Sequence, residues 1–182
     1  MILFSTGNLW LFTRVHSLVG QSAVLDYLAI FFAEYSQYVI AAWFVWLCVR
    51  RHAQLENRIL VVVAATAALV ARIVVKSIIL LFVAEPRPFV YLHFIPLISP
   101  AAGEELQSFP SGHALFFFAL ASATFLFNKR YGAYLLIVAS IMGLSRIYVG
   151  VHWPFDIVSG ALFGVGVGYA SYHMYLRYST HG

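Results

Sequence analysis

Long apolar stretches alternate with short polar connections along most of this chain. Five stretches, at residues 23–49, 59–83, 112–128, 132–149 and 155–176, approach or exceed the roughly 20 apolar residues that a helix needs to cross a bilayer. The third and fourth are short for a spanning helix but lie within the tolerated range. The pattern therefore predicts an all-α integral membrane bundle of five to six helices, forming one domain over residues 1–182.

The first 22 residues follow a different pattern, because polar residues interrupt the apolar ones before spanning length is reached. Such an amphipathic segment favours a helix that lies in the membrane interface. Residues 23–176 would then form the transmembrane core, and a tilted sixth span over the first residues is the alternative.

Composition favours a membrane protein over a water-soluble one. Hydrophobic residues make up 62% of the chain and charged residues 10%, whereas soluble domains carry about 25% charged residues. A soluble fold of this length could not bury so much apolar surface. The net charge of +4 comes mainly from loop arginines and lysines without a dense basic run, so no nucleic-acid partner is expected.

Basic residues in the connections predict how the chain is oriented. With five spans, three basic stretches of the chain fall on the same side of the membrane. The first contains Arg50, Arg51 and Arg58, the second contains Lys129 and Arg130, and the third contains Arg177. Because basic loop residues favour the cytoplasm, we expect a multi-pass protein of the inner (plasma) membrane whose other side faces the periplasm or the cell exterior.

Three polar segments interrupt the apolar pattern on that outer side. They are EPRPF at residues 85–89, SFPSGH at 108–113 and SRIYVGVHWPFD at 145–156. The prolines of the first segment end the second span and leave Arg87 on non-helical backbone. Ser111 is placed to cap the third span, where free N–H groups and the helix dipole suit an anion. Ionisable groups in such places are costly and usually functional.

The third segment holds the candidate nucleophile. If a helix begins at Pro154, Asp156 lies four residues after His152 and can accept a hydrogen bond from its Nδ1. That bond would leave Nε2 free as a nucleophile or base. The guanidinium groups of Arg87 and Arg146 suit phosphate oxygens, so the predicted ligand is a phosphoryl group.

These residues resemble a known family in type, spacing and order. PSGH at residues 110–113 and the pattern S-R-x5-H-x3-D at 145–156, preceded by Arg87 and Pro88, are similar to the motifs of the type 2 phosphatidic acid phosphatases. The four fixed positions of the last motif recur by chance at roughly one site in 10^5. The resemblance covers roughly residues 60–175 and implies a membrane lipid phosphatase with its site at the outer membrane–water interface.

The resemblance also implies a role for each matching residue. His152 would accept the phosphoryl group as phosphohistidine, Asp156 would orient it, and His113 would protonate the leaving oxygen and then activate water. The implied phosphate-binding groups are Arg87, Arg146, Ser111 and the backbone N–H of Gly112. No metal or other cofactor is expected, because the arginines and the helix start supply the positive field that Mg²⁺ supplies elsewhere.

One position departs from the family pattern. The first motif usually places a lysine seven residues before its arginine, and that position here is Leu80. Lys76 lies one helical turn deeper. It either substitutes by extending its long side chain toward the phosphate or is buried and paired within the bundle.

The choice of lipid stays open at this point. The short chain and compact outer loop resemble bacterial undecaprenyl diphosphate phosphatases, with phosphatidylglycerophosphate and phosphatidic acid phosphatases as alternatives. A metal-dependent enzyme is a further possibility, in which His113, His152, Asp156 and His93 would ligate zinc. The nearby arginines disfavour it, because a cation would repel them.

A lipid transporter is the alternative from another functional class, with Glu34, Arg72 and Lys76 as an intramembrane relay. Glu34 and Arg72 lie at similar depth by residue count, so we expect a buried ion pair between them instead. The glycines at 160, 164 and 168 form a ridge that permits close helix contact, within the bundle rather than between copies. The sequence indicates no particular oligomeric partner.

Overall fold

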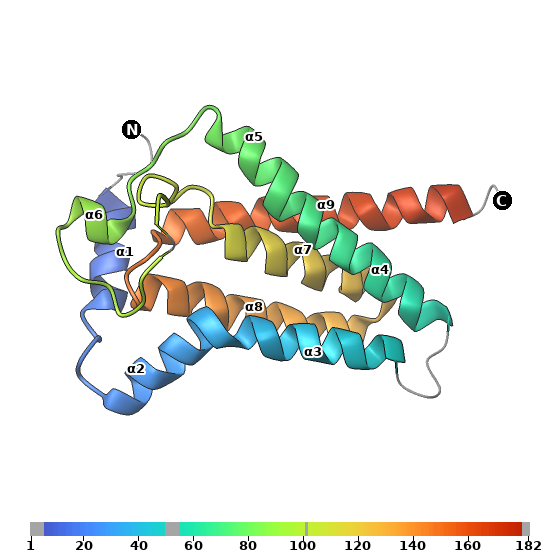
Figure 1. Cartoon of the computed structure of the whole chain (residues 1–182), viewed down its shortest axis with the longest axis horizontal. Coiled ribbons are helices and arrows are strands. Elements are labelled where there is room, and N and C mark those ends of the chain that lie inside the picture. The colour runs from blue at the N-terminus through green and yellow to red at the C-terminus, as the bar shows by residue number, and fades with distance from the viewer. Residues whose placement is uncertain (1–5, 50–54, 101, 180–182) are drawn as a thin grey trace.

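The computed structural model describes residues 6–49, 55–100 and 102–179, and most of them are helical (Figure 1). The elements in chain order are α1 (Thr6–His16), α2 (Ala23–Ile30), the π-helical turn η1 (Phe31–Tyr35), α3 (Ser36–Val49), α4 (Leu55–Leu69), the π-helical turn η2 (Val70–Val75), α5 (Lys76–Leu80), α6 (Pro88–Tyr91), α7 (Gly112–Phe127), α8 (Lys129–Tyr148) and α9 (Pro154–Ser179).

The expected all-α membrane bundle is confirmed. Three helical segments of the described chain are long and apolar enough to cross a membrane, at Ala23–Leu47, Leu55–Leu80 and Lys129–Tyr148. The other two expected spans correspond to α7, which is apolar but has 16 residues, and to α9, whose 26 residues include several glycines, serines and tyrosines.

α7 is the central helix, and it contacts α4, α8 and α9. Small side chains make this possible, since Ala119, Ala121 and Ala123 of α7 are fully buried. Asn128 ends α7 and begins α8, because its side-chain oxygen accepts a hydrogen bond from the backbone N–H of Tyr131 at 3.1 Å. A single capping residue thus turns the chain between two antiparallel spans.

The three polar segments lie at one end of the bundle. Figure 1 shows the loop after α5, the start of α7, the end of α8 and the start of α9 at that end. The start of α4, the start of α8 and the end of α9, which carry Arg58, Lys129, Arg130 and Arg177, lie at the other. Arg50 and Arg51 fall outside the described residues.

α1 packs across the end that holds the polar segments (Figure 1). Its 11 described residues extend about 16 Å, roughly half of the hydrocarbon thickness. The side-chain oxygen of Asn8 accepts a hydrogen bond from Phe155 N at 3.0 Å, and the ring of Phe12 lies 5.1 Å from that of Trp153. α1 therefore holds the start of α9 in place.

The glycine ridge of α9 faces α7 of the same chain, as expected. A Cβ atom at Gly160 would lie 2.9 Å from the carbonyl oxygen of Ser111, and one at Gly164 would lie 2.6 Å from that of Leu115. At Gly168 an added Cβ would collide with the side chain of Ser122. The two backbones approach so closely that a side chain does not fit between them.

The expected ion pair between Glu34 and Arg72 is wrong. Between described residues, the N···O contacts within 4.0 Å join Arg87 to Glu104 and His152 to Asp156, and neither Glu34 nor Arg72 takes part. These two residues lie in the π-helical turns η1 and η2. A π turn adds a residue to the helical repeat, so residue counting along a regular helix does not give the faces that these side chains occupy.

The contact between α7 and α9 gives a test of stability. Gly164→Ala should destabilise the protein by about 1–3 kcal/mol, because the added methyl group forces two packed backbones apart. Gly166→Ala is the matched control, since nothing lies within 4 Å of its Cβ position and alanine is the better helix former. Thermal unfolding of both variants in one detergent measures the difference. Equal midpoints would contradict this packing.

Candidate active site

Two loop segments pair at the polar end of the bundle and position the first arginine. The N–H of Glu85 donates to Leu106 O, that of Arg87 to Glu105 O, and that of Ser108 to Glu85 O, each at 3.0 Å. The prolines around Arg87 prevent a helix from continuing through this segment, which leaves its backbone free for this pairing. Arg87 and Ser108 are thereby fixed beside the start of α9.

His152 lies between Asp156 and Arg87. Its Nδ1 is 3.4 Å from Asp156 Oδ2, and its Nε2 is 3.3 Å from Arg87 Nη1. A guanidinium group only donates hydrogen bonds, so Nε2 is the acceptor and Nδ1 carries the proton. The predicted histidine–aspartate pair is therefore present, and the lone pair of Nε2 points toward the guanidinium that would hold an anion.

Asp156 is fully buried and is oriented by further donors. Its Oδ2 accepts hydrogen bonds from Ser108 Oγ at 2.5 Å and from Trp153 N at 2.9 Å. α9 begins at Pro154, as predicted, so the carboxylate lies in the first helical turn, where the dipole favours negative charge. The sequence analysis includes Ser108 in the polar segment 108–113 but gives it no role, because nothing in the sequence pairs it with a residue 48 positions later.

Burial and nearby cations keep His152 neutral. The pKa of His152 lies well below its ordinary value of 6.5, first because the side chain is removed from solvent and then because Arg87 and Arg146 repel an added proton. A lowered pKa means that the imidazole loses its proton in more acidic solution. At pH 7 it is therefore the neutral, nucleophilic form.

Glu104 is the counter-charge of Arg87. The Nη2 of Arg87 lies 2.9 Å from Glu104 Oε2 in an ion pair, its Nε donates to Glu104 O at 2.9 Å, and its Nη1 donates to Val151 O at 3.1 Å. Arg87 is 1% exposed, so these contacts fix its position. Glu104 belongs to no motif, and the pairing of the two loops that brings it here is not visible in the sequence.

Arg146 reaches the same region from the end of α8. Its Nη1 donates to the carbonyl oxygen of Ala33 in η1 at 3.0 Å. Its Nε is buried and has no hydrogen-bond partner in the described part of the chain. Buried donors are rarely left unpaired, so this guanidinium has capacity for a further acceptor.

The predicted cap at the start of α7 is present. Ser111 is the N-cap, since its Oγ accepts a hydrogen bond from Ala114 N at 3.4 Å. The Ser111 N–H donates to Asp156 O at 3.2 Å and ties this helix start to α9. His113 follows Gly112 in the first turn and interacts electrostatically with His152. The two histidines thus belong to one site.

The structure brings Lys76 to this helix start. A Cβ atom on Gly112 would lie 3.3 Å from Lys76 Nζ and 3.4 Å from Nη1 of Arg72. Leu80, at the position where the family has its lysine, instead lines a separate small pocket beside residues 103–107. Lys76 therefore lies beside the start of α7, and so does Arg72, for which the sequence predicts a pairing with Glu34.

The ligand set of the zinc hypothesis does not assemble. It required His113, His152, Asp156 and His93 around one ion. Within the described ranges, no three histidine, cysteine, aspartate or glutamate side chains are arranged to hold a metal ion. The charged groups that do converge around His152 are mainly cations, a donor set that suits an anion.

The chain is thus an apolar helical bundle that holds a buried histidine among arginines at one end. The sequence profile described as the PAP2 superfamily matches residues 58–179. The chain belongs to this superfamily of phosphatases and is a hydrolase.

Relatives of the chain include two Bacillus proteins. The undecaprenyl-diphosphatase BcrC of Bacillus subtilis is 30% identical over 94% of this chain and 84% of its own length. The bacitracin transport permease protein BcrC of Bacillus licheniformis is 35% identical over 89% of this chain and 77% of its own. The crystal structure of Aquifex aeolicus LpxE is similar with a TM-score of 0.70 and 28% identity, over 94% of this chain and 98% of that one.

The protonation state of His152 gives a test of the site. We expect ¹⁵N NMR of imidazole-labelled protein to show a neutral ring with the proton on Nδ1 at pH 7. Because its pKa is lowered, this signal should persist below pH 6.5, while free histidine in the same buffer titrates near its ordinary value of about 6.5. His152→Ala assigns the resonance. A doubly protonated ring at pH 7 would refute the geometry described here.

Proposed function

We propose that this protein hydrolyses undecaprenyl diphosphate to undecaprenyl phosphate and inorganic phosphate through a phosphohistidine at His152. The observation that carries the proposal is the position of His152, with Nδ1 directed at Asp156 and Nε2 at Arg87. This geometry leaves one ring nitrogen with a lone pair beside a phosphate-binding group.

In the first step, Nε2 of His152 would attack the terminal phosphorus and displace the lipid phosphate. Arg87, Arg146, the Ser111 hydroxyl and the Gly112 N–H would bind the non-bridging oxygens of the transferred group. Phosphoryl transfer depends mainly on such positioning and on compensation of negative charge. Once the bound diphosphate supplies negative charge, His113 would take up a proton from water and donate it to the leaving oxygen, so the lipid departs as a phosphate monoester.

In the second step, the now neutral His113 would accept a proton from water as the water attacks the phosphohistidine. The P–N bond breaks, inorganic phosphate leaves, and His152 returns to its neutral form. Asp156 would stabilise the imidazolium character of the phosphorylated ring through Nδ1–H, as a carboxylate does in other histidine-based sites. Ser108 and Trp153 N hold that carboxylate in place.

The preference for undecaprenyl diphosphate is supported by the Bacillus subtilis relative, which carries the name undecaprenyl-diphosphatase and aligns with 94% of this chain. An outer-facing site is supported by the basic residues at the opposite end of the bundle. Recycling of a carrier lipid on the periplasmic or exterior face of the inner membrane fits that orientation. Phosphatidylglycerophosphate and phosphatidic acid are the competing substrates.

The substrate is tested by phosphate release from purified lipids in one detergent. We expect the highest kcat/KM for undecaprenyl diphosphate, ahead of phosphatidylglycerophosphate and phosphatidic acid. Turnover should survive dialysis against EDTA, because arginines and a helix start supply the positive field. A higher kcat/KM for phosphatidylglycerophosphate would reassign the substrate, and reversible loss of activity in EDTA would overturn the metal-free mechanism.

His152→Ala tests the covalent mechanism and separates it from transport. It should lower phosphate release by about 10^3-fold or more and abolish ³²P labelling of the protein from terminally labelled undecaprenyl diphosphate. Glu34→Gln is the control, since a transporter that uses Glu34 as a relay would lose function, whereas the phosphatase should keep its turnover. Labelling of the His152→Ala protein would place the nucleophile elsewhere.

A further inference from the structure

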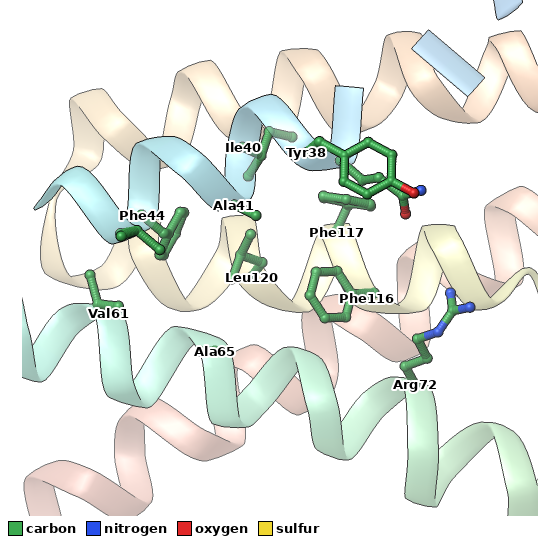
Figure 2. Close-up of a pocket in the computed structure, with 12 residues that line it drawn as sticks. Tyr38, Ile40, Ala41, Phe44, Val61, Ala65, Arg72, Phe116, Phe117 and Leu120 are labelled. Atoms are coloured by element: carbon green, nitrogen blue, oxygen red, sulfur yellow. The ribbon is translucent and has the colours of Figure 1, made fainter. Parts of the chain in front are cut away.

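An apolar pocket of about 640 Å³ lies between α3, α4 and α7 (Figure 2). This volume is within the range of about 300–1,000 Å³ of small-molecule sites. Its walls are formed mainly by aliphatic and aromatic side chains, among them Phe44, Val61 and Phe116. Figure 2 shows Arg72 at one end of the pocket, with its guanidinium directed from its own helix into the space beside α7.

Arg72 also borders the catalytic end of the bundle. Its Nη1 lies 3.4 Å from the place of a Cβ on Gly112, next to Lys76 Nζ. It interacts electrostatically with His113 and Arg146, which belong to the proposed site. The side chain therefore connects two regions, an apolar pocket on one side and the cationic site around His152 on the other.

The surroundings of Arg72 leave its charge without a carboxylate. The ion pairs between described residues join other side chains. Arg72 precedes Leu80, the last residue of α5, by eight positions, or about 12 Å along the helix. The Arg72 side chain is exposed in the structure and borders the pocket, and a cation at this position along a membrane-spanning helix is costly and usually functional. A ligand with an anionic group on an apolar tail fits the two regions that Arg72 borders, the cationic site and the apolar pocket.

A lipid diphosphate presents two phosphates that require different positions. The terminal phosphate must reach Nε2 of His152 to be transferred. The proximal phosphate stays on the lipid and becomes the leaving group. It must therefore lie between His152 and the part of the protein that binds the lipid chain. Arg72 occupies the corresponding place between the site and the apolar pocket. A lipid monophosphate has no second phosphate to put there.

We propose that Arg72 binds the proximal phosphate of a lipid diphosphate, with the first part of the lipid chain in the adjoining pocket. Arg72 would thus determine specificity for diphosphates over monophosphates. Negative charge grows on the proximal phosphate as the P–O bond breaks, and the guanidinium would stabilise it. The inference rests on the phosphatase function proposed above and adds a second phosphate subsite to it.

The test compares diacylglycerol diphosphate with phosphatidic acid of the same acyl chains. Arg72→Gln should lower kcat/KM for the diphosphate about 10- to 100-fold more than for phosphatidic acid, as expected for one charged hydrogen-bonding partner. Arg72→Lys should recover part of the loss. Inhibition by orthovanadate, which resembles a single phosphate at His152, should change little in Arg72→Gln. Arg58→Gln, at the far end of α4, is the control for loss of an arginine.

Three outcomes would overturn this subsite. Equal losses for both lipids, together with weaker vanadate inhibition, would make Arg72 part of the general phosphate site. Unchanged kinetics would remove it from substrate binding. If Arg72→Gln aggregates in size-exclusion chromatography, Arg72→Lys decides, and equal losses of kcat/KM for both lipids in that variant would overturn the subsite. If the proposed phosphatase function were itself wrong, the unsubstituted protein would form no phosphoenzyme. That result differs from each of the outcomes for the Arg72 variants.

Discussion

A cluster of positive charge at one end of an apolar bundle is the constraint on which the rest of this structure depends. Arg87, Arg146, Lys76 and Arg72 all contribute to it, and cations in a medium of low dielectric repel one another strongly. The carboxylate of Glu104 pairs with Arg87, and backbone carbonyls offset more of the repulsion, at Ala33 for Arg146 and at residues 104 and 151 for Arg87. The cations of this cluster outnumber that carboxylate, so positive charge is left at this end of the bundle.

The same field acts on His152. Burial, and then the surrounding cations, disfavour a protonated His152, while a buried carboxylate beside Nδ1 fixes the tautomer. The carboxylate of Asp156 must itself be held, and Ser108 and the backbone of Trp153 do so. The site is thus a chain of hydrogen bonds running from a loop, through a helix start, to the reactive atom.

Features set by neighbouring residues could be predicted from the sequence. The Ser111 cap, the helix start at Pro154 and the pairing of His152 with Asp156 each depend on four or five consecutive positions. Contacts that depend on loop pairing, such as Glu104 with Arg87, could not. The π-helical turns also leave no periodic signal, and they rotate side chains away from a regular helical register. That rotation is the physical reason why Arg72 was assigned to Glu34 rather than to the site.

α1 carries a consequence for how the protein is made. Its hydrogen bonds reach partners that are 132 and 147 residues later in the chain, at Tyr148 and Phe155. During synthesis from the N-terminus, this helix leaves the ribosome long before those partners exist. The contacts of α1 with Tyr148 and Phe155 therefore form only after the last helix has been inserted. A chain arrested before Tyr148 lacks these contacts of α1 and also lacks His152 and Asp156.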